Sequence, residues 1–459
     1  MKLVKMSLVA AMVMGASAFA VDNVKVSGDA KLFYNTNNAD YTKDGVTQSG
    51  LFDQGVAGQG GAAADTALRL GVTGDLLKGV SFGLTANAVS TLGLENNLVS
   101  NTWNSAHKHA GAQGVNDAMW ISEAWLATTM GKTTAKIGRM ELDTPLAFSE
   151  KWSVAANTFD AAVLINQDLP DTTLVGAWVG KGNGVNALAP LSTAKDNRNA
   201  VNALGIDGIM AANAGFSTYG SKGAYAVAAV NNSFKPLTAQ AWYYNVVDIA
   251  DAYWLQADIA CSLVKDLKIG LQYANMNPKG SVDAVTVANG AGNAKDSSAY
   301  AAKLAYEGVK NLKVSVAYSD VDADGVLNIS NTATNNLLAA QSKLYTEAFW
   351  NYGYVGAPGA TSWNATAEYD AGFAKLGAYY TDVTIDNNNN AVVGVLNTLS
   401  LSRANGTDMT EIALSASKSF GPLDATLAYI STDADDQNKD AAGNGQRYDS
   451  VQAYLTLNF

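Results

Sequence analysis

The chain has 459 residues, of which only 15% are charged while 48% are hydrophobic. Average soluble proteins carry about a quarter charged residues, so this composition is not typical of a soluble globular domain. The formal net charge of −11 argues against a nucleic-acid partner, and the single cysteine, Cys261, excludes an intramolecular disulfide bond.

The first twenty residues have the pattern of a secretory signal peptide. Lys2 and Lys5 form a basic start, an apolar segment runs from Leu8 to Met14, and small residues stand at Ala18 and Ala20. The apolar segment is short for a membrane-spanning helix, which makes an uncleaved anchor the weaker alternative. We therefore expect residues 1–20 to be removed after export, leaving residues 21–459 as a single domain.

Further along the chain, the clearest pattern is an alternation of apolar and polar residues. It occurs in residues 68–72, 253–261, 267–273, 312–318 and 451–459. Successive side chains of a β-strand point to opposite faces, so this pattern predicts strands that are apolar on one face only. A long uncharged run, residues 348–367, is interrupted by Asn, Gly, Ser and Pro and does not predict a membrane-spanning helix.

Short and long connections alternate between the predicted strands. Short turns are expected near residues 75–79, 131–133, 166–171, 233–236, 264–266, 307–311, 370–373 and 420–422. Longer loops are expected near residues 35–65, 93–117, 141–158, 180–223, 276–297, 322–360, 385–408 and 433–447, with a short one near 248–251. The seven prolines all fall in these connections, as strands with no spare N–H require.

This one-sided pattern predicts an all-β fold, a transmembrane antiparallel β-barrel of about 18 strands. The short turns would be periplasmic and the long loops extracellular. A barrel also explains the low charge, because only every second residue of each strand must face lipid. A soluble β-sandwich would share the alternation but lacks this asymmetry between its two ends.

Several segments, the signal peptide among them, carry a resemblance to known families. The segment Val26–Tyr34 and the C-terminal residues 455–459 resemble the major outer membrane porins of Campylobacter-type bacteria. Residues 136–146, continuing to 157–160, are similar to the substrate-specific porins of the OprD type. Both resemblances imply an eighteen-stranded barrel, commonly trimeric, whose third long loop folds inward and narrows the channel.

The charges around this loop depart from the OprD-type pattern, in which basic residues line the pore. In this chain the acidic residues of the segment outnumber the basic ones: Glu141, Asp143, Glu150 and Asp160 against Arg139 and Lys151. The resemblance therefore does not extend to specificity for carboxylate substrates.

The third long loop, residues 141–158, is the predicted pore constriction. Pro145 and the apolar Leu146, Phe148 and Trp152 suit a loop packed against an inner wall, although a loop lying over the mouth is the alternative. Inside the lumen, this loop would present Asp143 and Glu150 to passing solutes. Three basic residues on the polar faces of their strands could stand opposite these carboxylates: Arg69, Lys268 and Lys313.

These features predict an outer-membrane porin that contacts lipid and lets ions and small hydrophilic solutes diffuse through a water-filled channel. The net acidity predicts a mild preference for cations, and the resemblance implies a homotrimer. A surface adhesin and an outer-membrane hydrolase are the alternatives. The only histidines, His107 and His109, have no serine or aspartate motif beside them, so we expect no enzyme activity.

A metal site is a weaker hypothesis, and no other cofactor is expected. Asp320, Asp322 and Asp324, followed by Gly325, have the spacing that opens an EF-hand calcium loop. The twelfth position is Asn331, where that loop needs a bidentate glutamate, so solvated loop acids are the alternative. His107 and His109 could contribute to a zinc site only with further ligands.

Overall fold

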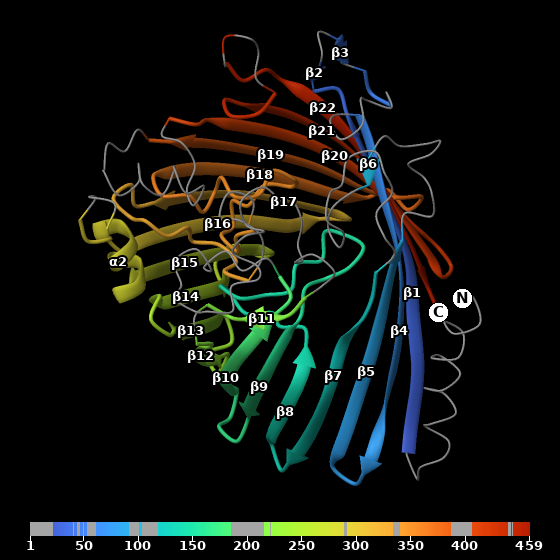
Figure 1. Cartoon of the computed structure of the whole chain (residues 1–459), viewed down its shortest axis with the longest axis vertical. Helices are drawn as coiled ribbons and strands as arrows, with labels where there is room; N and C mark the ends of the chain where they lie inside the picture. The colour runs from blue at the N-terminus through green and yellow to red at the C-terminus, as the bar shows by residue number, and fades with distance from the viewer. Residues whose placement is uncertain are drawn as a thin grey trace.

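The computed structural model describes residues 22–39, 41–43, 46–48, 50–52, 61–90, 101–102, 118–184, 215–220, 222–288, 292–333, 340–386, 406–438, 442 and 444–459. In this part of the chain, one 20-stranded sheet closes on itself, because the first long strand pairs with the last and also with the second. Two of its strands have only two residues, which leaves 18 long strands that pair antiparallel (Figure 1). The predicted fold class is confirmed.

The long strands follow one another around the barrel in chain order. They are β1 (Asp22–Asn37), β4 (Gly61–Leu77), β5 (Val80–Ser90), β7 (Ala118–Met130), β8 (Thr133–Met140), β9 (Phe159–Asn166), β10 (Thr172–Gly182), β12 (Ala224–Asn231), β13 (Leu237–Val246), β14 (Ala250–Ala260), β15 (Leu267–Pro278), β16 (Ser297–Val309), β17 (Leu312–Val321), β18 (Ala360–Asp370), β19 (Lys375–Ile385), β20 (Met409–Phe420), β21 (Leu423–Ala434) and β22 (Tyr448–Asn458).

The remaining elements are short. The strands β6 (Asn101–Thr102) and β11 (Ser217–Thr218) join the barrel sheet, while β2 (Tyr41–Lys43) and β3 (Val46–Gln48) form a separate hairpin. A helix, α2 (Gly280–Ala288), lies in a loop for which the sequence predicted no regular structure. Within the described ranges, no helix is long and apolar enough to cross a membrane. Pro278 ends β15 rather than lying in the following loop.

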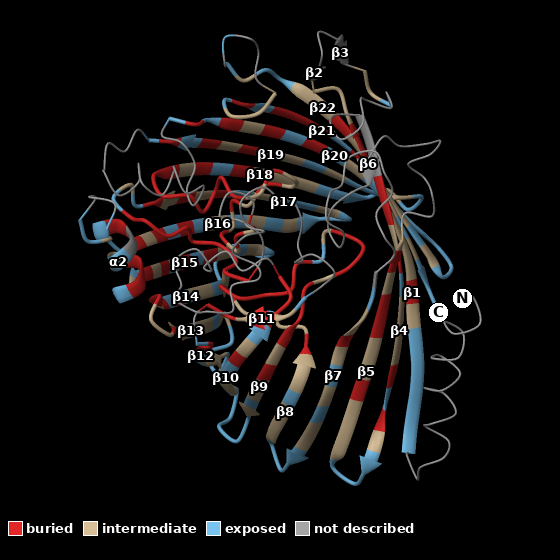
Figure 2. Cartoon of the chain, viewed as in Figure 1, coloured by how far each residue is buried: buried red, intermediate tan, exposed pale blue. Residues whose placement is uncertain are grey.

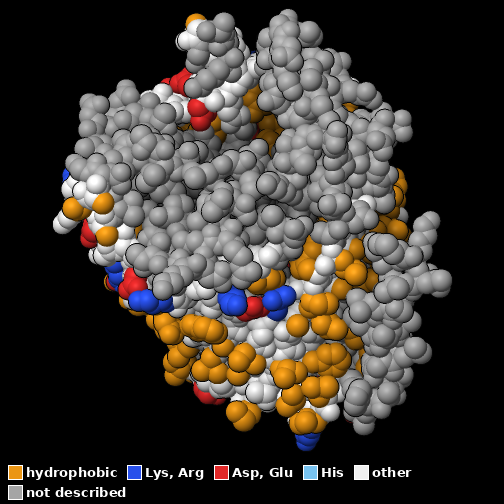
Figure 3. All heavy atoms as spheres, viewed as in Figure 1, with side chains coloured by type: hydrophobic (Ala, Val, Ile, Leu, Met, Phe, Trp, Pro, Cys, Tyr) orange, Lys and Arg blue, Asp and Glu red, His pale blue; other side chains and the backbone are white. Residues whose placement is uncertain are grey.

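The two faces of the wall differ as the alternation predicted. Along β17, Val314 and Val316 are exposed on the outside, at 37% and 52%, whereas Ala317 and Ser319, which point to the opposite face, are buried. The burial colours alternate along the strands in Figure 2, and hydrophobic side chains cover the lower outer wall over β7 to β10 in Figure 3. A surface of this kind is stable in the apolar interior of a bilayer.

Tight turns join neighbouring strands at one end of the barrel; those of β4–β5, β7–β8 and β9–β10 lie at the lower edge of Figure 1. Several turn residues have positive φ, including Gly131 at 61° and Asn311 at 63°. Glycine and asparagine tolerate this left-handed conformation better than other residues. These turns are therefore encoded locally, at positions where the sequence predicted them.

The lumen contains two long loops, which appear as buried segments inside the barrel in Figure 2. One is residues 141–158, between β8 and β9. The other lies between β17 and β18, and its described residues are 322–333 and 340–359. The sequence predicted an extracellular loop here. Its Ile329, Tyr354 and Val355 are fully buried at 0% exposure. The structure differs here because the loop is apolar enough to fill the barrel interior.

Substitutions on the two faces of one strand test which face of the wall contacts lipid. Leu414 of β20 is 51% exposed on the outer face, and Ser417 of the same strand lines a cavity inside the barrel. We expect Leu414→Arg to lower the free energy of unfolding from lipid vesicles by about 2–4 kcal/mol, since a charge would enter the bilayer. Ser417→Arg should change it by less than about 1 kcal/mol. Equal losses of unfolding free energy in urea titrations of the two variants would contradict this assignment of the two faces.

Candidate functional site

The loop of residues 141–158 crosses the lumen from Met140 to Phe159, the facing ends of β8 and β9. Leu146, Phe148 and Val154 are each 5% exposed or less. Leu146 and its neighbours line a small apolar cavity together with inner-wall residues of β13 and β14. Packing of these apolar side chains against the wall places the loop inside rather than over the mouth.

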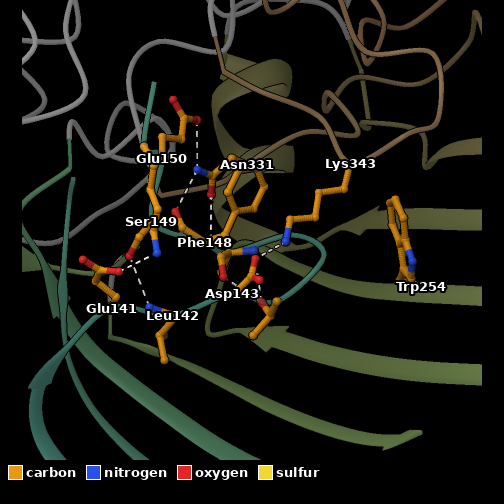
Figure 4. Close-up of polar contacts among 12 residues, drawn as sticks. Glu141, Leu142, Asp143, Phe148, Ser149, Glu150, Trp254, Asn331 and Lys343 are labelled. Atoms are coloured by element: carbon orange, nitrogen blue, oxygen red, sulfur yellow. Dashed lines mark hydrogen bonds and ion pairs between the residues drawn. The ribbon is translucent and has the colours of Figure 1, made fainter. Parts of the chain in front are cut away.

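The second loop, described over residues 322–333 and 340–359, is joined to the first by reciprocal hydrogen bonds. The amide N–H of Phe148 donates to Asn331 Oδ1 at 3.1 Å, and Asn331 Nδ2 donates to the Phe148 carbonyl at 2.9 Å. The backbone N–H of Thr332 donates to the Leu146 carbonyl at 3.0 Å. Figure 4 shows Asn331 beside Phe148. The two loops therefore form one body, and Asn331, the twelfth position of the calcium motif, joins them.

Buried carboxylates tie these loops to each other and to the wall. Glu150, 2% exposed, accepts hydrogen bonds from Asn331 Nδ2 at 2.9 Å and from the Gln341 N–H at 3.2 Å. Glu411 of β20, 1% exposed, accepts from the backbone N–H groups of Phe349 at 2.7 Å and Asn351 at 2.8 Å. Backbone amides buried in loops need such acceptors, because unpaired polar groups are costly away from water.

A third buried carboxylate, Glu347, interacts electrostatically with the other two. The pKa of Glu347 is raised to about 8, chiefly by burial and to a smaller extent by the negative charges of Glu150 and Glu411. Its carboxylate accepts backbone hydrogen bonds from Ser342 and Ala348, which oppose this shift. The group is therefore mostly protonated at neutral pH, which reduces repulsion within the cluster.

The charges that face the opening are paired at contact distance. Glu141 lies 3.4 Å from Arg69 Nη1 and 2.7 Å from Lys151 Nζ, and Arg69 Nη2 lies 2.6 Å from Asp29 Oδ2 on the neighbouring strand. Arg69, expected to stand across the lumen from the loop carboxylates, thus joins the wall to the loop. Contact pairing leaves a weaker transverse field than opposed, separated charges would produce.

One ion pair bridges the two loops. Asp143 and Lys343 are in contact, and their side chains point toward each other from the two loops in Figure 4. The Asp143 side chain is 85% exposed and that of Lys343 is 33% exposed. Asp143 therefore exposes its side chain to solvent. Glu150 does not, because it is buried among amides.

Four predicted site residues lie away from this constriction. Arg139 and Asp160 pair directly across β8 and β9, with Arg139 Nε 2.8 Å from Asp160 Oδ1. Arg139 is two residues from Ile137 on the same strand, so both side chains point to the same face of the wall. Ile137 is 61% exposed on the outer wall. The strand register thus places both on the outer face, which differs from the predicted lumenal position.

Lys268 and Lys313 lie on the inner face but near the short turns that precede β15 and β17. Lys268 Nζ is 2.8 Å from Glu307 Oε2. Lys313, Glu368 and Lys375 line an inner cavity of about 590 Å³ near this end. Their charges therefore line a vestibule below the constriction rather than the constriction itself.

The sequence reasoning missed the aromatic residues of the second loop. Trp350 stacks edge-on against Trp152 of the first loop, with ring centroids 5.4 Å apart, and lies 5.9 Å from Phe33 of β1. Residues 345–354 include five aromatic residues, an unusual density for an exposed loop. This composition was the available signal that the loop packs inside.

The three aspartates of the calcium motif have separate partners. Asp320 accepts a hydrogen bond from Thr361 Oγ1 at 3.1 Å, Asp322 accepts from the Asp324 N–H at 2.9 Å, and Asp324 lies 2.7 Å from Lys295 Nζ. In the part of the chain that the structure describes, no three His, Cys, Asp or Glu residues are grouped as a metal site. Calcium binding stays a prediction; His107 and His109 lie outside the described residues.

Comparison with known proteins relates this barrel to solved structures. No protein-family model matches the chain, and no curated protein is significantly similar in sequence. The outer membrane protein OpdK from Pseudomonas aeruginosa is 13% identical, with a TM-score of 0.64 over 95% of this chain and 99% of OpdK. OprD of the same organism is also 13% identical, with a TM-score of 0.63 over 95% of each chain.

At this identity the similarity shows the fold. The fold is that of the OprD-type porin structures, in agreement with one of the two resemblances. The resemblance to the porins of Campylobacter-type bacteria stays a prediction. OpdK has also been solved with vanillate, with a TM-score of 0.62 to this chain.

The buried glutamate predicts that the packing of the second loop depends on pH. The pKa of Glu347 is raised from 4.5 to about 8, so the folded loop holds an extra proton between these values. The stabilisation is complete below about pH 4.5 and is lost as the pH rises through about 8. Amide hydrogen exchange of residues 341–351, corrected for its intrinsic rate, should therefore accelerate over this interval.

Glu347→Gln should remove most of this pH dependence, because the amide keeps the shape but cannot ionise. Glu368→Gln, in the vestibule, provides the matched control and should keep it. The assignment fails if the exchange profile of Glu347→Gln follows that of the unmodified chain.

Proposed function

We propose that this chain is an outer-membrane porin whose water-filled lumen lets small hydrophilic solutes and ions diffuse passively across the membrane. The observation that carries the proposal is a closed wall, apolar outside, around a lumen narrowed by two loops fixed to the wall. Barrels of this strand number enclose an aqueous space wide enough to need such narrowing. The similar fold of the outer membrane protein OpdK supports this location.

The constriction would select solutes by its gap and by the charges that remain accessible. Arg69, Lys151 and Lys343 are each paired with a carboxylate, and the side chain of Asp143, the partner of Lys343, is 85% exposed. A mild preference for cations follows from this exposed carboxylate together with the net charge of −11. Aromatic rings beside the charges would also favour flat solutes.

The remaining parts of the prediction belong to the same proposal. Residues 1–20 would direct export and be cleaved before insertion. A homotrimer is proposed from the sequence resemblance alone, and one chain already encloses a complete lumen. We expect no enzyme activity. A surface adhesin is the second candidate, but it would have no use for a charged lumen closed off by anchored loops.

Planar-bilayer recordings of the purified, folded protein test the channel. We expect stepwise conductance and a reversal potential in a salt gradient that indicates a modest cation preference. Bilayers that stay electrically silent would refute the porin and favour the adhesin.

Charge variants at the constriction test the selectivity. Asp143→Asn should lower the cation-to-anion permeability ratio by about two- to fourfold, since a charge about 5 Å from an ion in water is worth roughly 0.8 kcal/mol. Lys343→Gln should raise the ratio. Asp171→Asn, in a turn outside the lumen, should leave it unchanged; a shift of similar size there would mean that the constriction does not set selectivity.

A further inference from the structure

The outer wall over β7 to β10 has an apolar hollow. Its rim consists of the large side chains of Leu126, Ile137, Leu164 and Trp178, and its volume is about 670 Å³. The hollow exists because small residues stand between these side chains on the same face. At Gly176, an added Cβ would meet no atom within 4 Å.

Charged side chains lie above this hollow, toward the loop end of the same strands. Asp160 of β9 pairs across the sheet with Arg139 of β8 on one side and with Lys181 of β10 on the other. Arg139 forms the ion pair with Asp160, at 2.8 Å. Lys181 is exposed and forms no ion pair among the described residues, so the triplet has a net charge of +1.

The hollow and the charges belong to one continuous strip of the outer wall. Asp160 and Leu164 are four residues apart on the same face of β9, which corresponds to about 13 Å along a strand. Figure 3 shows basic and acidic side chains in a row directly above the hydrophobic surface of these strands. Trp178, which is 42% exposed, lies between the two regions, where indole rings favour the membrane interface.

We propose that this strip binds a phosphorylated lipid of the surrounding membrane, with an acyl chain in the hollow and the phosphate at Lys181 and Arg139. The acyl chain fills a surface that side chains leave open, and the anionic headgroup supplies the charge that Lys181 lacks. A second copy of the chain is the alternative occupant of the hollow, and the experiment below distinguishes it from lipid.

The inference rests on the proposed membrane location. Native mass spectrometry of the full, folded protein in detergent micelles containing phosphatidic acid gives the amount of bound lipid. Diacylglycerol with the same acyl chains serves as the probe without phosphate. We expect the protein to retain phosphatidic acid and to retain diacylglycerol at least about fivefold less. One charged residue near the membrane surface accounts for a difference of about this size.

Two variants separate the parts of the site. Lys181→Gln should reduce retention of phosphatidic acid about fivefold, and Gly176→Leu should reduce retention of both lipids by filling the hollow. The matched controls are Lys418→Gln, another exposed cation on the outer face of β20, and Ala378→Leu, a small outward residue of β19. Both controls should retain lipid like the unmodified protein.

Equal retention in the site variants and the controls would overturn the proposal. So would a dimer or trimer that Gly176→Leu dissociates, because the occupant would then be a second copy. Bilayer conductance of the same preparations is the separate measure of the porin function: a conducting protein without selective lipid retention refutes the lipid site alone.

Discussion

The structure depends on the closure of one hydrogen-bonded ladder. Because β1 pairs with both β22 and β4, the long strands that the structure describes have no open edge. Closure satisfies the backbone polar groups of the strands even where lipid replaces water. It also forces alternate side chains outward and inward, so the apolar outer belt and the polar lumen have the same origin.

A lumen of this width must be filled or hydrated, and two loops fill part of it. Their backbone amides leave the strand ladder and need other partners, which Glu150 and Glu411 provide. Burying a carboxylate is costly, but several amide donors to one group offset that cost. The Asn331 side chain then joins the loops. Both loops are therefore anchored to each other and to the barrel wall.

Electrostatic pairing organises both faces of the wall. Inside, Glu141 is held between Arg69 and Lys151, so little unbalanced charge acts across the lumen. Outside, the pairs lie where the apolar belt ends, as with Asp160 and Arg139. In both places a charged group stays accessible to its surroundings: Asp143, which is paired with Lys343 but largely exposed, inside, and Lys181 outside. Such groups carry the interaction with solutes and with lipid in our proposals.

The sequence by itself determined the barrel, its strand number and its tight turns, because alternation and turn chemistry are local properties. The apolar residues around Leu146 and Phe148 also pointed to an inward loop. Only the tertiary structure decided the rest. Strand register turned Arg139 outward, and closure brought Lys343 to Asp143, 200 residues away in the chain. Contacts of this kind form only when the barrel wall closes and the two loops pack together in the lumen. A local sequence pattern therefore cannot predict them.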